Sequence, residues 1–251
     1  MMQDTVCDIT YNFSSKNFVI TGASSGIGRQ TAIDLAKAGA NVLIIARREA
    51  ELQLVKNEYP DKIFIGCCDV TNYDELEDNI NNFVAKQGKL DGCVHAAGIV
   101  EFTPLRLYDE EKAKKIMDIS FWAGVKLVQL CTKVSRANKG TSNILFSSSS
   151  GNKGEKGMFA YSSAKAAVKV AVKSIAQELA DKKHRINTIS PGFVRSQMTE
   201  DTIISDDLLK RYLLGAGLPA DISGVVLFLL SSQSAWITGS DIIVDGGYMS
   251  S

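Results

Sequence analysis

Short apolar runs alternate with longer segments of helical periodicity along almost the whole chain. The short runs are rich in valine and isoleucine, which is typical of strands that are buried on both faces of a parallel sheet. Strands are expected at 17–20, 41–46, 62–67, 90–95, 142–147, 185–190 and 241–244. Helices are expected at 29–38, 49–58, 74–86, 109–137 and 159–180. The alternation predicts a doubly wound α/β fold in which helices flank a seven-stranded parallel sheet on both faces.

We expect residues 1–251 to form a single domain, because no linker, repeat or low-complexity segment interrupts the alternation. Residues 1–15 precede the first strand as an amino-terminal extension. Residues 197–218 form a long connection between the sixth strand and the final helix, and long ordered connections are often lids over binding sites. We therefore expect a substrate lid here, although a segment of this composition could equally pack on a partner subunit.

The first strand runs directly into the sequence Thr21-Gly22-Ala23-Ser24-Ser25-Gly26-Ile27-Gly28, called the glycine turn below, and then into a helix. Glycines permit positive φ angles and a close approach of the backbone to a ligand, and the amides that open a helix favour negative charge. The arrangement predicts a diphosphate site in a Rossmann-type fold. Its expected contacts are Gly22, Ser24, Ser25, Gly26, Ile27 and Gly28.

The end of the second strand indicates the form of the dinucleotide. A carboxylate at this point would bind the adenosine ribose hydroxyls, whereas this chain has Ala46 followed by Arg47 and Arg48. Two guanidinium groups suit a phosphate on that ribose, so NADP(H) is favoured and NAD(H) stays possible. The alternative is that both arginines are solvated residues at the start of a helix.

A candidate acid–base group lies further along the chain. Tyr161 and Lys165 are four residues apart in an alanine-rich helical segment, so both side chains fall on one helix face. The ammonium is expected to lower the pKa of the phenol, which is ordinarily about 10. Ser148, at the end of the fifth strand, could hold a carbonyl or alcohol oxygen while Tyr161 exchanges a proton with it. Alternatively, Tyr161 and Lys165 are an ordinary surface pair.

Together these motifs resemble the short-chain dehydrogenase/reductase family from about residue 17 to 248. Beyond the glycine turn, the similar segments are Cys68-Asp69-Val70-Thr71, Ala96-Ala97-Gly98, Pro191-Gly192-Phe193-Val194-Arg195-Ser196, Ile237-Thr238-Gly239 and Val244-Asp245-Gly246-Gly247. The resemblance implies that Ser148, Tyr161 and Lys165 are catalytic. It also implies coenzyme contacts at Asp69, Val70, Ala97, Gly98, Tyr161, Lys165, Pro191, Gly192, Val194 and Ser196.

The resemblance implies an NADP(H)-dependent oxidoreductase that transfers a hydride between nicotinamide and a small-molecule carbonyl or secondary alcohol. It further implies a homotetramer or homodimer that associates through its long helices. The pocket is expected to include Phe102, Met158, Phe159, Phe193, Met198, Ile203, Ile204, Tyr212 and Leu213. The identity of the substrate does not follow from the sequence.

Two positions depart from the family pattern. His95 stands where the family commonly has the first asparagine of Asn-Asn-Ala-Gly, and we interpret it as structural. Ser120 stands where the family has a catalytic asparagine, and we expect it still to hold a water beside Lys165. Because of these departures, the alternative function is a non-catalytic nucleotide-binding regulatory or scaffold member of the same fold.

Composition argues against other classes of partner. Lys plus Arg and Asp plus Glu both number 28, so no net charge favours nucleic acid or an anionic membrane. No uncharged apolar run approaches the roughly 20 residues that span a bilayer, and the amino terminus lacks a signal-like pattern, so a cytoplasmic location is expected. The five cysteines and two histidines lack metal-site spacing, so no metal is expected. Cys67, Cys68 and Cys93 are expected to be buried.

Overall fold

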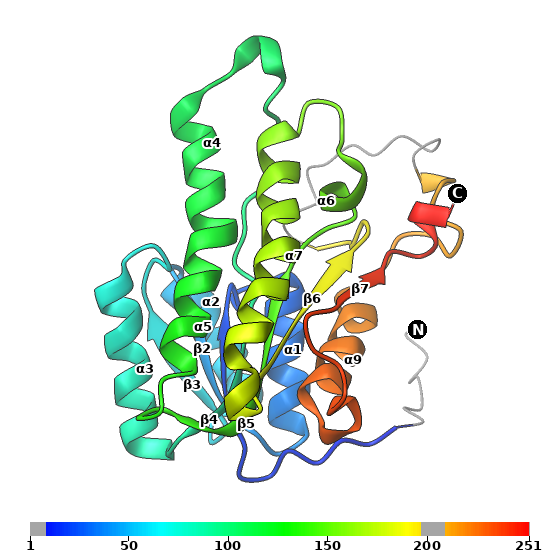
Figure 1. The fold of residues 1–251 in the computed structure, drawn as a ribbon. Coiled ribbons are helices and arrows are strands. Elements are labelled where there is room, and N and C mark those ends of the chain that lie inside the picture. The colour runs from blue at the N-terminus through cyan, green and yellow to red at the C-terminus, as the bar shows by residue number, and fades with distance from the viewer. Residues whose placement is uncertain (1–8, 197–208, 251) are drawn as a thin grey trace.

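The computed structural model describes residues 9–196 and 209–250, and these form a sheet with helices on both faces (Figure 1). Within the described residues the sheet has seven strands in the order β3-β2-β1-β4-β5-β6-β7, and every neighbouring pair is parallel. The strands are β1 Asn17–Thr21, β2 Asn41–Ala46, β3 Ile63–Cys67, β4 Leu90–His95, β5 Ala137–Phe146, β6 Arg185–Pro191 and β7 Asp241–Val244. The predicted doubly wound fold is confirmed.

The helices agree with the expected ones except in the middle of the chain. They are α1 Gly26–Lys37, α2 Glu49–Glu58, α3 Tyr73–Gln87, α4 Glu110–Met117, α5 Ala123–Cys131, α6 Ser150–Lys153, α7 Phe159–Leu179 and α9 Pro219–Leu230. The long helical region expected over 109–137 is confirmed from Glu110 to Cys131, but it ends before Ala137, where β5 begins. It contains a π-helical segment, η2 (Asp118–Trp122), between α4 and α5, and α5 ends where the Thr132 hydroxyl donates to the carbonyl of Val128 at 2.8 Å.

Alternate residues of the central strands face two separate apolar cores. Phe18 and Ile20 of β1 pack with α1, α2 and α9, whereas Val19 packs with α3, α5 and α7 on the other face. Each of these three strand side chains is at most 1% exposed. Burial on both faces explains why the strands are continuously apolar instead of alternating between apolar and polar residues.

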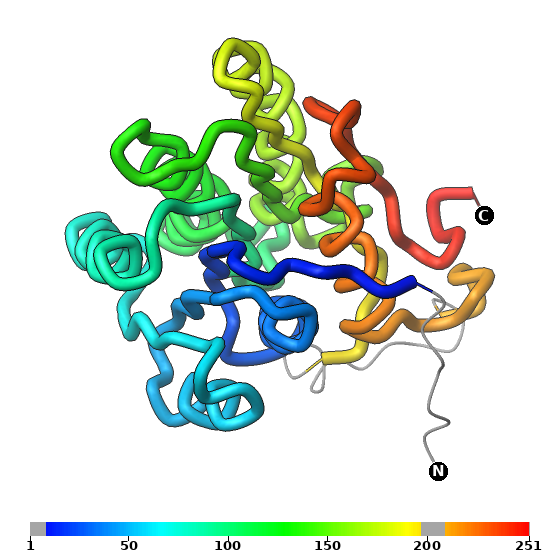
Figure 2. Tube along the Cα trace, turned by 90° about the horizontal axis from the view of Figure 1, so that it is seen from below, coloured from blue at the N-terminus to red at the C-terminus, as the bar shows by residue number. Residues whose placement is uncertain are grey.

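The residues before β1 cross the underside of the molecule, below the amino ends of the strands (Figures 1 and 2). Phe13 is buried there, stacks on Tyr11 with 5.9 Å between ring centroids, and meets Phe18 edge-on at 5.5 Å. Part of the predicted amino-terminal extension is therefore packed against the core. Residues 1–8, and residues 197–208 of the predicted lid, lie outside the described residues.

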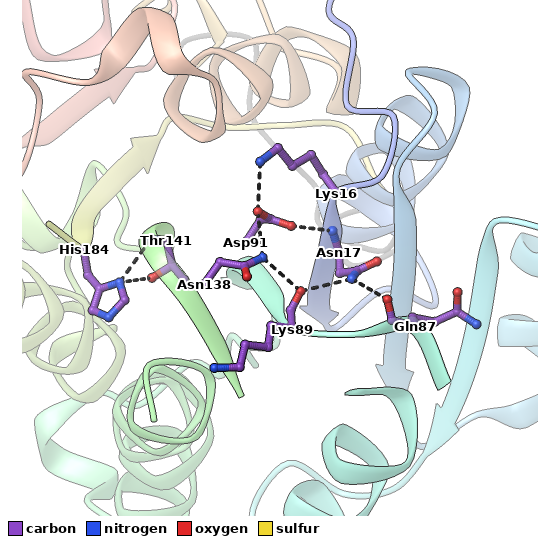
Figure 3. A network of polar contacts seen from close by, with 8 residues as sticks. All are labelled: Lys16, Asn17, Gln87, Lys89, Asp91, Asn138, Thr141 and His184. Atoms are coloured by element: carbon purple, nitrogen blue, oxygen red, sulfur yellow. Dashed lines mark hydrogen bonds and ion pairs between the residues drawn. The ribbon is translucent and has the colours of Figure 1, made fainter. Parts of the chain in front are cut away.

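A polar network ties β1, β4 and β5 together at the amino ends of the strands (Figure 3). The carboxylate of Asp91 accepts hydrogen bonds from Lys16 Nζ at 3.0 Å, the Asn17 amide at 2.9 Å and Asn138 Nδ2 at 3.2 Å. Asn17 Nδ2 in turn donates to the carbonyls of Gln87 and Lys89 at 2.8 and 3.0 Å. The network holds three adjacent strands in register and leaves their carboxyl ends for ligand binding.

Candidate active site

A cavity of about 930 Å³ lies at the carboxyl edge of the sheet, where six of the strands end. Every residue expected to contact the coenzyme lines it, as do Ser148, Tyr161 and Lys165. Ser120 is not among the lining residues in the described part of the chain. Parallel strands all point their carboxyl ends at one rim, so groups far apart in sequence meet there.

The glycine turn owes its shape to two close backbone approaches. Gly22 has a φ of +69°, and a Cβ at this position would lie 2.4 Å from the amide nitrogen of Ala97, two residues after the end of β4. A Cβ at Gly28 would lie 2.4 Å from the carbonyl oxygen of Gly22. Only glycine therefore fits at either position, and the turn brings the start of α1 up to the cavity.

The amides at the start of α1 face this cavity. Ser25 is the N-cap residue, and within the described structure its side chain makes no capping hydrogen bond to them. A helix start of this kind attracts anions through its amides and its dipole. The backbone amides at the start of α1 are therefore suitable hydrogen-bond donors for a diphosphate.

Arg47 and Arg48 flank the same end of the cavity. Arg48 Nη2 donates to Ser24 Oγ at 3.2 Å, which links the second strand's end to the glycine turn. Arg47 Nη1 lies 3.7 Å from Asp69 Oδ2, but Arg47 is 63% exposed, so this ion pair contributes little to stability. Burial raises the pKa of Asp69, but hydrogen bonds from Thr71 and the charge of Arg47 outweigh it and leave that pKa below its ordinary value.

Three cysteines lie near this end of the fold, and one of them differs from expectation. Cys68 and Cys93 are buried, whereas Cys67 is exposed. The prediction for Cys67 is wrong because it ends β3, the edge strand of the sheet, and no further strand covers it. Burial raises the pKa of Cys68 to about 11, so its thiol stays protonated at neutral pH.

The three candidate catalytic side chains meet as expected. Ser148 follows β5, Tyr161 and Lys165 share a face of α7, and the hydroxyl of Ser148 lies close enough to that of Tyr161 to affect its ionisation. Lys165 Nζ lies 5.6 Å from the centroid of the Tyr161 ring and donates to the carbonyl of Phe146 at 2.9 Å. Its backbone carbonyl accepts from Ser147 Oγ at 2.8 Å. The start of α7 is thereby fixed against the end of β5.

The electrostatics of this group differ from the expected pattern. Burial raises the pKa of the Tyr161 phenol, and the hydrogen bond from Ser148 opposes that rise. Burial also lowers the pKa of Lys165 to about 8. The phenol pKa is therefore raised where the sequence predicts a lowered one, because loss of hydration outweighs the hydrogen bond from Ser148.

Ser120 and His95, the two departures from the family pattern, lie beside this group. Ser120 is 1% exposed, and its Oγ has no hydrogen-bond partner in the described part of the chain. A Cβ placed on Gly98 would lie 3.6 Å from both Ser120 Oγ and Lys165 Nζ, so the two polar atoms border one small space. His95 bonds to Thr21 and Ile119. A bridging water at Ser120 stays a prediction.

The substrate end of the cavity is mainly apolar. Of the residues expected there, the structure places Phe102, Met158, Phe193 and Tyr212 in the lining. Phe159 and Leu213 are outside the described lining, because Phe159 packs against Tyr108 and Leu213 covers Gly247. Met198, Ile203 and Ile204 lie outside the described residues.

The lining residues that sequence reasoning missed include Glu155, Lys156 and Tyr248. Tyr248 Oη donates to Glu155 Oε1 at 2.6 Å, and its ring stacks on Tyr212 with centroids 4.5 Å apart. Burial, together with the hydrogen bond and charge of Glu155, raises the pKa of Tyr248 to about 12. The available signal was the Gly246–Gly247 pair, whose positive φ angles turn the chain back towards the cavity.

No described helix is both long and apolar enough to cross a membrane. Within the described residues, no group of three or more His, Cys, Asp or Glu side chains is arranged to hold a metal ion.

Comparison with known proteins places the chain in a family. A family model described as enoyl-(acyl carrier protein) reductase matches residues 22–249. A solved short-chain type dehydrogenase/reductase from Mycobacterium marinum is 32% identical, with a TM-score of 0.88 over 95% of this chain and 97% of that one. The chain belongs to the short-chain dehydrogenase/reductase family. This membership confirms the expected family and an oxidoreductase acting on C=O or CH–OH groups.

Other members of this short-chain dehydrogenase/reductase family are similar over almost their full length. The 3-oxoacyl-[acyl-carrier-protein] reductase FabG of Rickettsia bellii is 33% identical over 243 residues, which cover 95% of this chain and 98% of that protein. The protein of the same name from Thermotoga maritima is 31% identical and covers 91% of this chain and 96% of its own length. Similarity to reductases of this kind favours NADP(H) as the coenzyme.

Proposed function

We propose that this protein reduces the ketone of a 3-oxoacyl thioester to the 3-hydroxyacyl product with NADPH. The observation that carries the proposal is that Ser148, Tyr161 and Lys165 share one cavity with the glycine turn and the arginine pair. Relatives named 3-oxoacyl-[acyl-carrier-protein] reductase, similar along nearly the whole chain, support the choice of substrate class.

The donors in the cavity fit this coenzyme. The uncapped start of α1 suits the diphosphate, and Arg47 and Arg48 suit the phosphate on the adenosine ribose. Ala97, Gly98 and Val194 line the stretch between the turn and the catalytic side chains, where the nicotinamide end would lie. When bound, NADPH supplies the hydride that forms the new C–H bond.

The protein's own residues handle the oxygen and the proton. Because the Ser148 and Tyr161 hydroxyls line one cavity and lie close together, both can reach one substrate oxygen. Ser148 donates to that oxygen and polarises the carbonyl, and Tyr161 transfers its phenolic proton to it as the C–H bond forms. Lys165, with a pKa of about 8, is mostly cationic at neutral pH and stabilises the phenolate that Tyr161 leaves behind.

The substrate end suits an acyl chain. Phe102, Met158, Phe193 and Tyr212 offer apolar surface beside the reacting position, as the hydrocarbon part of a thioester requires. Phe102 is 71% exposed and its ring lies over Gly157, so it stands at the mouth of the cavity. We extend the proposal to a lid function for residues 197–218, of which Tyr212 already contributes to the lining.

The proposal includes a homotetrameric or homodimeric assembly in the cytoplasm. Support comes from α4, α5 and α7, which lie together on one side of the sheet (Figure 1). Exposed apolar side chains on this side include Trp122 of η2 and Val170 of α7. Light scattering of the purified protein should give a mass two or four times that of the chain. A monomer at micromolar concentration would contradict the assembly.

A cofactor-consumption assay tests the function. The purified protein is mixed with NADPH and 3-oxoacyl thioesters on coenzyme A or on acyl carrier protein, alongside simple ketones, ketosteroids and sugars. We expect NADPH oxidation with the thioesters and accumulation of 3-hydroxyacyl product. Turnover restricted to another panel member would overturn the substrate class, and tight NADPH binding without turnover on any of them would favour the non-catalytic alternative.

A further inference from the structure

His95 uses both ring nitrogens in the interior of the protein. It is the last residue of β4 and is 1% exposed. Its Nδ1 lies 2.8 Å from the hydroxyl of Thr21, the last residue of β1, and its Nε2 lies 2.9 Å from the carbonyl oxygen of Ile119 in η2. The imidazole therefore joins the strand that enters the glycine turn to the π-helical segment next to Ser120.

The partners of His95 determine its tautomer. A backbone carbonyl only accepts, so the hydrogen must be on Nε2 and points at Ile119. Burial lowers the pKa of His95 to about 4, against the raising effect of the Ile119 bond, and the charge of Lys165 lowers it further. The ring is therefore neutral at neutral pH, and its Nδ1 accepts a hydrogen bond from the Thr21 hydroxyl.

The neighbouring helix is adapted to the size of this ring. Gly124 lies in the first turn of α5, and a Cβ there would lie 2.9 Å from His95 Cδ2. Glycine at 124 leaves room for the imidazole between β4 and the helix. His95, Gly124 and η2 thus form one packed unit.

The same unit carries Ser120. A π-helical turn holds one residue more than an α-helical turn, and this rotates the side chains that follow, so the geometry of η2 decides where Ser120 points. Its buried Oγ has no partner in the described structure and borders the space next to Gly98 and Lys165 Nζ. Whatever holds the carbonyl of Ile119, the preceding residue, also holds this hydroxyl beside the catalytic amine.

We propose that His95 is a positioning residue for the reaction. Its Nε2–H bond to Ile119 fixes η2 so that Ser120 Oγ stays beside Lys165 Nζ, and its Nδ1 bond anchors this unit to β1. The inference rests on the proposed reductase function for its kinetic consequences, whereas the fixing of η2 is a structural property that is measurable without activity.

Two amide substitutions separate the two bonds. The amide nitrogen of glutamine reaches about as far as imidazole Nε2, whereas asparagine reaches only about as far as Nδ1. H95Q therefore keeps the donor to Ile119, and H95N keeps only the contact with Thr21. We expect H95N to lower kcat by about 10- to 100-fold with little change in KM for NADPH, since small misplacements in an active site cost this much. The kcat of H95Q should stay close to that of wild type.

A double-mutant comparison distinguishes positioning from general stability. If His95 acts through Ser120, H95N should cause no further loss of kcat in an S120A background, whereas independent effects would multiply. Equal kcat values for H95N and H95Q, or multiplicative losses with S120A, would overturn the proposal.

If H95N does not fold, G124A serves instead, because its added Cβ presses on the ring of His95. G124A should lower kcat in the same way as H95N. An unchanged kcat would count against the proposal.

Hydrogen exchange gives a readout that needs no substrate. Amides over residues 118–124 should exchange faster in H95N than in wild type, and H95Q should stay protected. Equal protection in the two variants would overturn the inference even if the enzyme is active. A wild-type protein that is inactive on every thioester would instead refute the proposed function and leave this exchange comparison to decide the role of His95.

Discussion

Burial acts on Tyr161 and Lys165 in opposite directions, because each favours its uncharged form when water is removed. The pKa of the phenol rises, and that of the amine falls to about 8. The amine nevertheless keeps most of its charge at neutral pH, so it can stabilise a phenolate only when the proton leaves Tyr161 during reaction. Spacing along α7 fixes the proximity of these groups, whereas their burial sets their charge states.

Replacing Tyr161 by phenylalanine removes the transferable proton and keeps the ring. We expect Y161F to lower kcat at least about 100-fold, the size of effect typical of general acid catalysis, with nearly unchanged NADPH affinity. Stopped assays of thioester reduction and fluorescence titration of NADPH measure the two quantities. The matched control is Y59F, which alters a tyrosine outside the lining of the cavity and should retain turnover. Normal turnover by Y161F would reject its role as proton donor.

At the scale of single elements, we predict that Arg47 and Arg48, between β2 and α2, select NADPH over NADH. The R47A/R48A double variant removes both guanidinium groups near the ribose. Hydrogen bonds to charged groups contribute about 1.5–3 kcal/mol each, so the loss of two should lower kcat/KM for NADPH at least about 100-fold. The same variant assayed with NADH is the internal control and should change little. An equal loss with both coenzymes would show that the arginines hold the turn instead of selecting the phosphate.

The π-helical turn between α4 and α5 is also an element-scale feature. The apolar pattern over 109–137 predicts a long helical region, and the structure adds the π-helical segment η2 in the middle of it. A π-helical turn differs from an α-helical turn by a single residue, and that difference leaves little trace in hydrophobic periodicity. The tertiary structure shows the π-helical turn at the point where His95 of β4 bonds to the carbonyl of Ile119.

At the scale of the whole molecule, the polar network that stabilises the sheet and the cavity with the candidate catalytic groups lie at opposite edges of the sheet. The Asp91 network holds β1, β4 and β5 at their amino ends, and the cavity occupies the carboxyl edge. D91A leaves the Asn17 amide and Asn138 without this acceptor, which should cost about 1–3 kcal/mol of unfolding free energy. Urea denaturation measures the loss, and kcat should be unchanged.

D91N is the matched control for that variant, since it keeps the shape and one acceptor oxygen. It should lose less stability than D91A, because the half-exposed Lys16 contributes little through its charge alone. A large fall in kcat for D91A, without a change in the folded fraction at the assay temperature, would contradict the separation of the two edges.

Acid stability is a further whole-molecule property that depends on a single buried side chain. The pKa of His95 is lowered from 6.5 to about 4, so unfolded chains take up this proton before folded ones do. Its contribution to stability is fully present above pH 6.5 and is lost as pH falls towards 4, by up to about 3 kcal/mol. The unfolding free energy of wild type should therefore fall more steeply over this range than that of H95Q. If the unfolding free energies of wild type and H95Q fell equally with pH over this range, His95 would be protonated in the folded state as readily as in the unfolded chain.

The sequence by itself determined the order of strands and helices, the glycine turn and the spacing of Ser148, Tyr161 and Lys165. These features follow from short continuous apolar runs, from the helical period of 3.6 residues and from backbone freedom at particular glycines, all of which act over short stretches of chain. Because parallel strands end at one rim, the convergence of the site also followed from the order of elements.

Only the tertiary structure decided the rest. Several features depend on which surfaces lose water when the elements pack. They are the direction of the Tyr161 pKa shift, the exposure of Cys67 and the contact of Tyr248 with Glu155, which is 93 residues away. The link from Thr21 through His95 to Ile119 likewise joins three elements across the sheet and helix layers. Burial and long-range hydrogen bonding are properties of packed neighbours, and local sequence patterns do not specify those neighbours.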